Sequence, residues 1–211
     1  MKLVLSLTLT WMLLSTAEAL NCASCSGSCT EPVLTTCSSQ TMCVSAAITA
    51  SFPGASSGES VKACAPAAVC AASGNQTFAV STSNLRAVAS VQCCNTDACN
   101  AGNVSAPATP SNNSLQCFSC DYLNTDCSKK INCTGVEDRC FKANVTIGSL
   151  TKQTLGCASA NLCAAAANLS SLPLVQGFSD ITCCDMKLCN AAPTTTTTIG
   201  LLLGLLVFSL Y

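Results

Sequence analysis

The sequence predicts a small all-β, disulfide-rich protein built from two tandem modules, and three observations support this fold class. Cysteine accounts for 20 of the 211 residues while only 9% are charged, which is typical of a disulfide scaffold rather than of an ordinary soluble domain. The spacing of the cysteines repeats once along the chain, which indicates two copies of one unit. Between the cysteines, short segments alternate β-branched or aromatic residues with polar ones, as β-strands do.

Residues 1–19 are predicted to be a secretory signal peptide. Lys2 supplies a positive charge, an apolar run follows from Leu3 to Leu14, and small residues end at Ala19. These are the three parts of a signal peptide, and the apolar run is shorter than the roughly 20 residues that span a membrane. We therefore expect residues 1–19 to be removed and the remaining chain to enter the secretory pathway.

Residues 191–211 have the features of a signal for a glycosylphosphatidylinositol (GPI) anchor. An apolar tail over residues 199–211 follows a threonine-rich spacer, which in turn follows the small residues Asn190, Ala191 and Ala192. Small residues, a polar spacer and a terminal apolar tail are the parts of this signal. We expect the lipid to be attached at Asn190, with Ala191 or Ala192 as alternatives, and the residues that follow to be removed. The mature chain would then lie on the outer leaflet of the plasma membrane; a tail-anchored helix is the competing interpretation.

The body of the chain contains two copies of a ten-cysteine module, assigned to residues 20–100 and 115–190. Both copies open as C-x2-C, contain a C-x5-C pair and close as C-C-x4-C-N, ending at Asn100 and Asn190. The cysteines of the first module are Cys22, Cys25, Cys29, Cys37, Cys43, Cys64, Cys70, Cys93, Cys94 and Cys99. Those of the second module are Cys117, Cys120, Cys127, Cys133, Cys140, Cys157, Cys163, Cys183, Cys184 and Cys189.

Residues 101–114 are predicted to be a glycosylated linker between the two modules. The segment contains Pro107 and Pro110, small polar residues and no cysteine, which is typical of a linker. Two of the six Asn-x-Ser/Thr sequons of the chain lie in it. The candidate N-glycosylation sites are Asn75, Asn103, Asn112, Asn132, Asn144 and Asn168. Asn132 is the weakest of them because the middle residue of its sequon is Cys133.

The local sequence patterns predict hairpins and single strands. Residues 139–147 and 150–157 read as a hairpin that turns at Gly148-Ser149. Residues 42–50 and 60–64 read as its counterpart in the first module, joined by a long loop through Pro53, Gly54 and Gly58. Residues 85–94 and 178–184 are predicted to be strands that run into the paired cysteines, and residues 164–167 a short helical turn.

The cysteines could have three roles: zinc coordination, thiol redox catalysis or the formation of structural disulfides. The C-x2-C pairs would suit the first two. A signal peptide, however, places the chain in an oxidising compartment, where an even number of cysteines forms disulfides. No thioredoxin-like βαβ pattern surrounds either C-x2-C pair. We therefore expect a disulfide framework, whose connectivity the residues alone leave open.

Composition argues against several classes of function. The chain contains no histidine, which is the usual base beside a serine or cysteine nucleophile. The carboxylates form no obvious constellation, and Glu137-Asp138 reads as a solvated loop. A formal net charge of −1 does not favour a nucleic-acid partner. We expect no enzyme activity, no cofactor, no metal and no bound nucleic acid.

The pattern L-x-C-x2-C … C-C-x4-C-N with ten cysteines per module resembles the three-finger LU family of lymphocyte-antigen-6 and urokinase-receptor domains. The resemblance implies two tandem three-finger (snake-toxin-like) domains, in each of which three β-hairpin fingers project from a disulfide-packed palm. It further implies that Asn100 and Asn190 hydrogen-bond back across the palm. The pairs it implies are Cys22–Cys43, Cys25–Cys29, Cys37–Cys64, Cys70–Cys93, Cys94–Cys99, Cys117–Cys140, Cys120–Cys127, Cys133–Cys157, Cys163–Cys183 and Cys184–Cys189.

The function most consistent with these features is non-catalytic binding at the cell surface through the finger loops. The partner would be an extracellular or membrane protein that the sequence does not identify. The second module carries most of the charge, and its basic residues Lys129, Lys130, Arg139 and Lys142 are the candidate ligand-facing residues; a purely solubilising role is the alternative for them. A glycan-bearing protective surface coat and a phospholipase-inhibitor-like binder are the alternatives for the whole chain.

Overall fold

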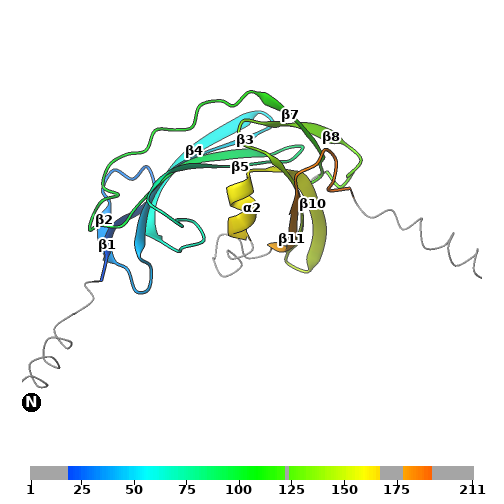
Figure 1. Ribbon diagram of the computed structural model, residues 1–211. Helices are drawn as coiled ribbons and strands as arrows, with labels where there is room; N and C mark the ends of the chain where they lie inside the picture. The colour runs from blue at the N-terminus through cyan, green and yellow to red at the C-terminus, as the bar shows by residue number, and fades with distance from the viewer. Residues whose placement is uncertain (1–18, 122–123, 167–177, 192–211) are drawn as a thin grey trace, which may run out of the picture. The chain divides into compact units, whose positions relative to one another are not determined.

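A computed structural model describes residues 19–121, 124–166 and 178–191 (Figure 1). The predicted signal peptide up to residue 18, the sequon at Asn168 and the chain beyond residue 191 lie outside these ranges, so the predictions made for them remain predictions. Within the described ranges, no helix is long and apolar enough to cross a membrane.

The described residues form eleven strands and one short helix, α2. The strands of the first module are β1 (Asn21–Gly27), β2 (Val33–Thr36), β3 (Met42–Phe52), β4 (Ala55–Ala65), β5 (Gly74–Ser81) and β6 (Arg86–Cys94). The second module contributes β7 (Asn112–Phe118), β8 (Lys130–Thr134), β9 (Arg139–Ile147), β10 (Leu150–Ala158), α2 (Ala160–Ala166) and β11 (Phe178–Cys184). The predicted small all-β, disulfide-rich fold is confirmed.

The chain divides into two compact units whose limits differ from those of the two sequence modules. Among the described residues, the first unit comprises residues 19–46, Ser60–Asn75 and Gln92–Val104. The second comprises Ala47–Glu59, Gln76–Val91 and the described residues from Ser105 onward. The second unit therefore contains the second module together with the distal parts of two hairpins from the first.

The first unit is organised around the disulfide-bonded ends of its strands. Strand β1 pairs antiparallel with β2, with Asn21 opposite Thr36, and also with β4, with Cys25 opposite Lys62. Its buried cluster consists of Cys22, Cys37 and Cys43. Half-cystines thus take the place that large apolar side chains occupy in an ordinary core, as the scarcity of such side chains in the sequence requires.

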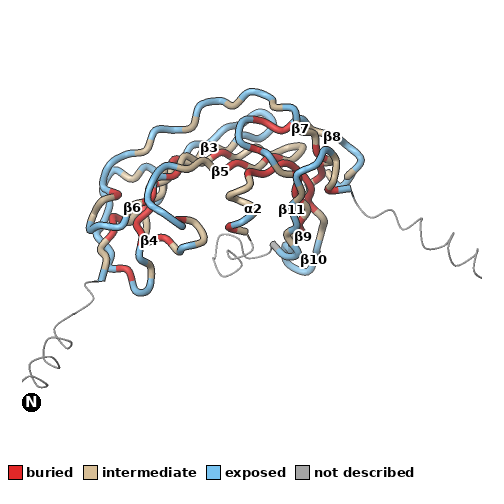
Figure 2. Tube along the Cα trace, in the orientation of Figure 1, coloured by how far each residue is buried: buried red, intermediate tan, exposed pale blue. Residues whose placement is uncertain are grey.

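Strand β10 is central to the second unit. It pairs antiparallel with β9 along its whole length and with β5 of the first module at its end, while β11 pairs with the far edge of β9. Strands β7 and β8 form a separate two-stranded sheet. Figure 2 shows buried residues on β9 and β10 near their disulfide-bonded ends and exposed residues at the turn of this hairpin.

Two predicted elements differ from the observed ones. Strands β3 and β4 are longer than predicted and are joined by Pro53-Gly54 alone, so the long loop predicted through Gly58 is wrong. Gly54 has φ +81°, a left-handed conformation that glycine adopts without strain and that the second central residue of a Pro-Gly type II turn requires. Helix α2 begins at Ala160, four residues before the predicted helical turn, because the carboxylate of Asp138 accepts a hydrogen bond from the Ala160 backbone N–H at 2.8 Å.

Candidate interaction site

All cysteines of both modules are paired in disulfides. The pairs are Cys22–Cys43, Cys25–Cys29, Cys37–Cys64, Cys70–Cys93, Cys94–Cys99, Cys117–Cys140, Cys120–Cys127, Cys133–Cys157, Cys163–Cys183 and Cys184–Cys189. These are the pairs that the resemblance to the LU family implies. Every disulfide joins two cysteines of the same module, so no covalent bond other than the backbone links the modules.

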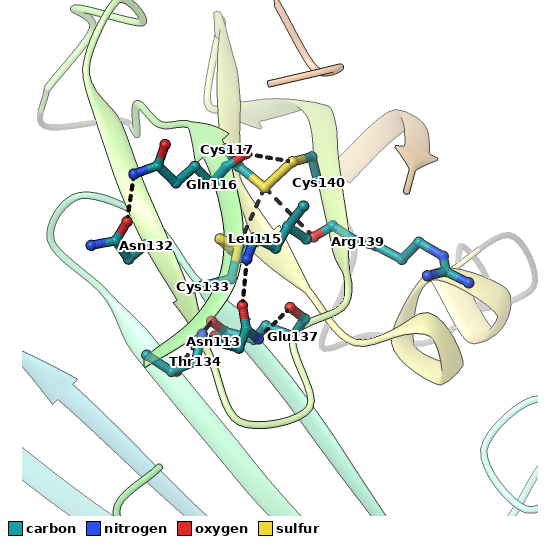
Figure 3. Close-up of a disulfide and its surroundings, with 12 residues drawn as sticks. Asn113, Leu115, Gln116, Cys117, Asn132, Cys133, Thr134, Glu137, Arg139 and Cys140 are labelled. Carbon is teal, nitrogen blue, oxygen red and sulfur yellow. Dashed lines mark hydrogen bonds between the residues drawn. A yellow bond between two sulfur atoms is a disulfide. The ribbon is translucent and has the colours of Figure 1, made fainter. Parts of the chain in front are cut away.

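Two disulfides touch at the centre of each palm. The Sγ atoms of Cys22 and Cys37 lie 3.3 Å apart, as do those of Cys117 and Cys133 in the second module (Figure 3). With Cys157, the latter two form a group of three sulfur atoms at a spacing that suits a metal. Each of these sulfurs belongs to a disulfide, however, whereas a zinc ligand must be a thiolate. The cluster is therefore structural.

The closing asparagine of each module binds backbone groups of the palm. Asn100, 3% exposed, accepts a hydrogen bond from Ala23 N–H at 2.8 Å and donates to the carbonyls of Ala23 and Val44. Asn190, 4% exposed, accepts from Phe118 N–H at 3.0 Å and donates to the carbonyls of Phe118 and Phe141. In each palm a single amide therefore holds together strands that are distant in the sequence.

Comparison with known proteins assigns this arrangement to a family. Residues 18–102 and 113–192 both match the u-PAR/Ly-6 domain. The chain belongs to the u-PAR/Ly-6 family. The resemblance inferred from the cysteine pattern is thereby confirmed.

Three u-PAR/Ly-6 relatives show how far the likeness extends. The chain is 32% identical to the urokinase plasminogen activator surface receptor of Mus musculus over 108 residues, which are 48% of this chain and 33% of the receptor. It is 32% identical to the Bos taurus receptor over 111 residues, 47% of this chain and 32% of the receptor. It is 37% identical to prostate stem cell antigen of Homo sapiens over 81 residues, 37% of this chain and 66% of that protein. The likeness thus covers about a third of the length of each receptor.

In the second u-PAR/Ly-6 domain, the hairpin β9–β10 presents an apolar tip. Ile147 and Leu150 are opposite each other in the register and are 50% and 55% exposed. The turn between them includes Gly148 at φ +62°, which suits a two-residue hairpin turn. Just below the turn, the hydroxyls of Thr146 and Thr151 share a hydrogen bond of 2.9 Å across the strands. The alternating sequence pattern predicts this turn but not the exposure of its two apolar residues.

The four basic residues predicted to face a ligand lie on or beside two strands. Lys130 is the first residue of β8, Lys129 directly precedes it, and Arg139 and Lys142 are on β9. Two of the four side chains interact with other side chains of the second domain. The ammonium group of Lys130 lies 5.7 Å from the centre of the Phe118 ring, and Arg139 forms a 3.2 Å ion pair with Asp138. Lys129 is exposed and Lys142 is partly buried.

Most of the predicted glycosylation sites are on the surface. Asn75, Asn103, Asn112 and Asn132 are exposed. Asn144 is half-buried, and its amide donates a hydrogen bond of 2.8 Å to the carboxylate of Asp180. The described sequons thus present at least part of each asparagine to solvent, as a bound glycan requires.

Glu137 is buried, which corrects the interpretation of Glu137-Asp138 as a solvated loop. Its side chain is 0% exposed, and one carboxylate oxygen accepts hydrogen bonds from the Thr134 N–H at 2.7 Å and the Thr134 hydroxyl at 3.2 Å (Figure 3). Burial raises the pKa of Glu137 because desolvation disfavours the charged form. Hydrogen bonds from Thr134 and the positive charge of Arg86 oppose this increase.

We expect Glu137→Gln to flatten the pH dependence of folding stability above the unfolded-state pKa of a glutamate, about 4.3. Because the folded-state pKa of Glu137 is raised, its contribution to stability is fully present below the unfolded-state pKa and is lost as the pH rises through the folded-state pKa. Glutamine keeps an acceptor for Thr134 but cannot ionise. The variant should therefore gain stability relative to wild type as the pH rises, which thermal unfolding at several pH values measures.

Asp126→Asn is the control for this experiment because its pKa shift has the opposite sign. A hydrogen bond from the Ser128 hydroxyl lowers the pKa of exposed Asp126. Stability contributed by Asp126 is therefore lost as the pH falls through its lowered pKa. If the stability curves of wild type and Glu137→Gln stay parallel over the whole pH range, the pH-dependent stability cannot be assigned to Glu137.

Proposed function

We propose that this chain is a non-catalytic, GPI-anchored glycoprotein of the cell surface that binds another protein through the finger loops of its second domain. The observation that carries the proposal is the apolar tip of hairpin β9–β10, where Ile147 and Leu150 are exposed side by side. The sequence signals at both ends support placement at the outer leaflet. Two relatives are surface receptors by name, which supports a role in recognition.

The hairpin suits binding because its apolar tip stands on a cross-linked base. Near the other end of the hairpin, Cys140 and Cys157 are each 0% exposed and bonded to the palm. Little conformational entropy is then lost when the tip orders against a partner. Burying one such apolar side chain contributes about 1.5 to 3 kcal/mol, so the pair can serve as the centre of a small interface. We propose that Lys129 and Lys142 attract acidic groups toward it.

We expect Ile147→Ala combined with Leu150→Ala to weaken partner binding at least about tenfold. A photocrosslinking amino acid in place of Ser149, at the turn, allows the partner to be captured on intact cells. The captured protein is then purified, and its affinity for the wild type and for the double variant is measured. Loss of the two side chains removes most of the apolar surface that the tip offers.

Met186→Ala is the matched control, since Met186 is 69% exposed and lies outside the hairpin. A partner whose affinity falls equally for Met186→Ala and for the double variant would contradict binding through the tip. A diffuse set of crosslinked proteins that the double variant leaves unchanged would support the surface-coat alternative. Release of the protein from intact cells by phosphatidylinositol-specific phospholipase C tests the anchor separately.

A further inference from the structure

The third hairpin of the first domain, β5–β6, pairs with the second domain. Within the second compact unit, Ser81 and Val80 of β5 are opposite Cys157 and Ala158 of β10 in an antiparallel register. We propose that this hairpin is a structural part of the second domain, bound so firmly that the two domains stay together after the linker is cut. The proposal is independent of the partner proposed above.

Hydrogen bonds extend the pairing beyond the end of β10. Ser159 N–H donates to the carbonyl of Ala79 at 2.9 Å, and the Ser159 hydroxyl accepts from Ala79 N–H at 3.1 Å. The side chain of Asn161 then donates to the carbonyl of Thr77 at 2.9 Å. Ser81, Ala79 and Ser159 are at most 4% exposed. The backbone groups joined here are shielded from water, so separating them would leave buried donors and acceptors unpaired.

The loop of hairpin β5–β6 is held by one carboxylate of the second domain. Asp121 accepts hydrogen bonds from the Thr82 hydroxyl at 3.1 Å, from Asn84 N–H at 3.2 Å and from the Asn84 amide at 3.0 Å. Hydrogen bonds to an ionised carboxylate are stronger than those between neutral groups. Nearby, the hydroxyls of Ser83 and Ser119 share a hydrogen bond of 3.1 Å.

The second domain fixes the position of this carboxylate. Cys120, which precedes Asp121, exchanges two backbone hydrogen bonds with Leu155 of β10, at 3.2 and 3.0 Å, and is bonded to Cys127. Asp121 is thereby attached to the same strand that pairs with β5. Strand β10 pairs with β5, and through Cys120 it also holds Asp121, which binds the loop of the same hairpin.

Gly156 shows how closely the two domains approach. A Cβ atom at this position would overlap the carbonyl oxygen of Ser81 and would lie 2.9 Å from the ring of Phe141. Only glycine leaves room for the backbone of β5 there. The sequence of β10 is thus adapted to a neighbouring strand from the first domain.

A cut in the linker tests the proposal on the complete chain. A site for a sequence-specific protease is inserted after Ala106, and the cleaved protein is passed over a size-exclusion column at about 10 µM. Since every disulfide lies within one domain, only non-covalent contacts then hold the fragments together. We expect the fragments to elute as one species. Two separated species from the cleaved wild type would overturn the proposal.

Substitutions identify the contact that holds the two cleaved fragments together. Asp121→Ala in the cleavable chain should weaken the association of the fragments about 100-fold. Asp126→Ala is the control, because Asp126 is exposed and bonds to Ser128 in its own loop. Equal dissociation constants for these two variants would overturn the assignment of the contact to Asp121.

A variant on the other side of the contact keeps the test valid if Asp121→Ala does not fold. Asn84→Ala removes hydrogen bonds to the same carboxylate while leaving the second domain unaltered. We expect it to weaken the association about tenfold in the wild-type background and to have no effect once Asp121 is replaced. Additive effects of the two substitutions would show that the residues act independently and would overturn their assignment as partners.

Discussion

Replacing both Cys133 and Cys157 with alanine is expected to unfold the second domain. The disulfide spans 24 residues, and opening a loop of that size costs about 3.5 kcal/mol of stability through the entropy of the unfolded chain. Both half-cystines are 0% exposed, so a cavity adds to this loss. The sum approaches the whole stability of a small domain, about 5 kcal/mol at the lower end. Chemical denaturation of the purified protein, with its yield from the secretory pathway, measures the effect.

Replacing Cys25 and Cys29 with alanine is the matched control. This disulfide spans four residues and is expected to contribute about 2 kcal/mol. Its loop is mostly exposed, so little packing is lost. The first domain should therefore fold without it. Equal loss of stability in the two double variants would contradict the view that the buried sulfur cluster replaces an apolar core.

The cysteine pattern was sufficient to predict the fold class and the repeat. Cysteines constrain both the positions of strands and the contacts between strands. A repeat of the cysteine spacing can be recognised without knowledge of the tertiary structure. Hairpin β9–β10 was predicted with its turn at Gly148 because polar and β-branched residues alternate on both sides of it. By contrast, β4 has few such residues, and its serines and glycine read as a loop.

Contacts between distant residues could not be predicted from local patterns. Asp121 is 37 residues from Asn84 in sequence, and nothing around either residue indicates the other. Glu137 read as solvated because charged residues are mostly exposed, whereas its hydrogen bonds to Thr134 and its burial follow from packing. Gly156 likewise has no local signature of close approach to another strand. The contacts between hairpin β5–β6 and the second domain therefore cannot be predicted from the sequence alone.

The apolar tip was missed for a different reason. The prediction of ligand-facing residues rests on charge, yet Arg139 is paired with Asp138 in the same domain. The exposure of Ile147 and Leu150 depends on how the other described segments pack, and a strand pattern does not reveal that. The sequence signal for such a tip is a pair of large apolar residues on either side of a predicted two-residue turn.

Asn190→Ala is expected to destabilise the second domain by at least about 3 kcal/mol. The variant loses hydrogen bonds to Phe118 N–H, to the Phe118 carbonyl and to the Phe141 carbonyl, at 3.0, 2.9 and 2.8 Å. Each backbone group left unpaired away from water costs about 1 to 3 kcal/mol. Denaturation of the protein recovered from the secretory pathway measures the change. Asn95→Ala, at an exposed asparagine outside the palm contacts, should leave stability within about 0.5 kcal/mol of wild type.

The same substitution separates the two roles assigned to Asn190. Alanine is as small as the Ala191 and Ala192 that follow, so Asn190→Ala preserves the small residues that an anchor signal requires. A GPI anchor is joined through the main-chain carboxyl group, which leaves the amide side chain free to bind the palm. Asn100→Ala in the first domain removes the equivalent palm contacts where no anchor is attached. Similar losses of stability in the two variants would assign the side chain to the palm, whereas a stable Asn190→Ala protein that fails to reach the surface would contradict that role.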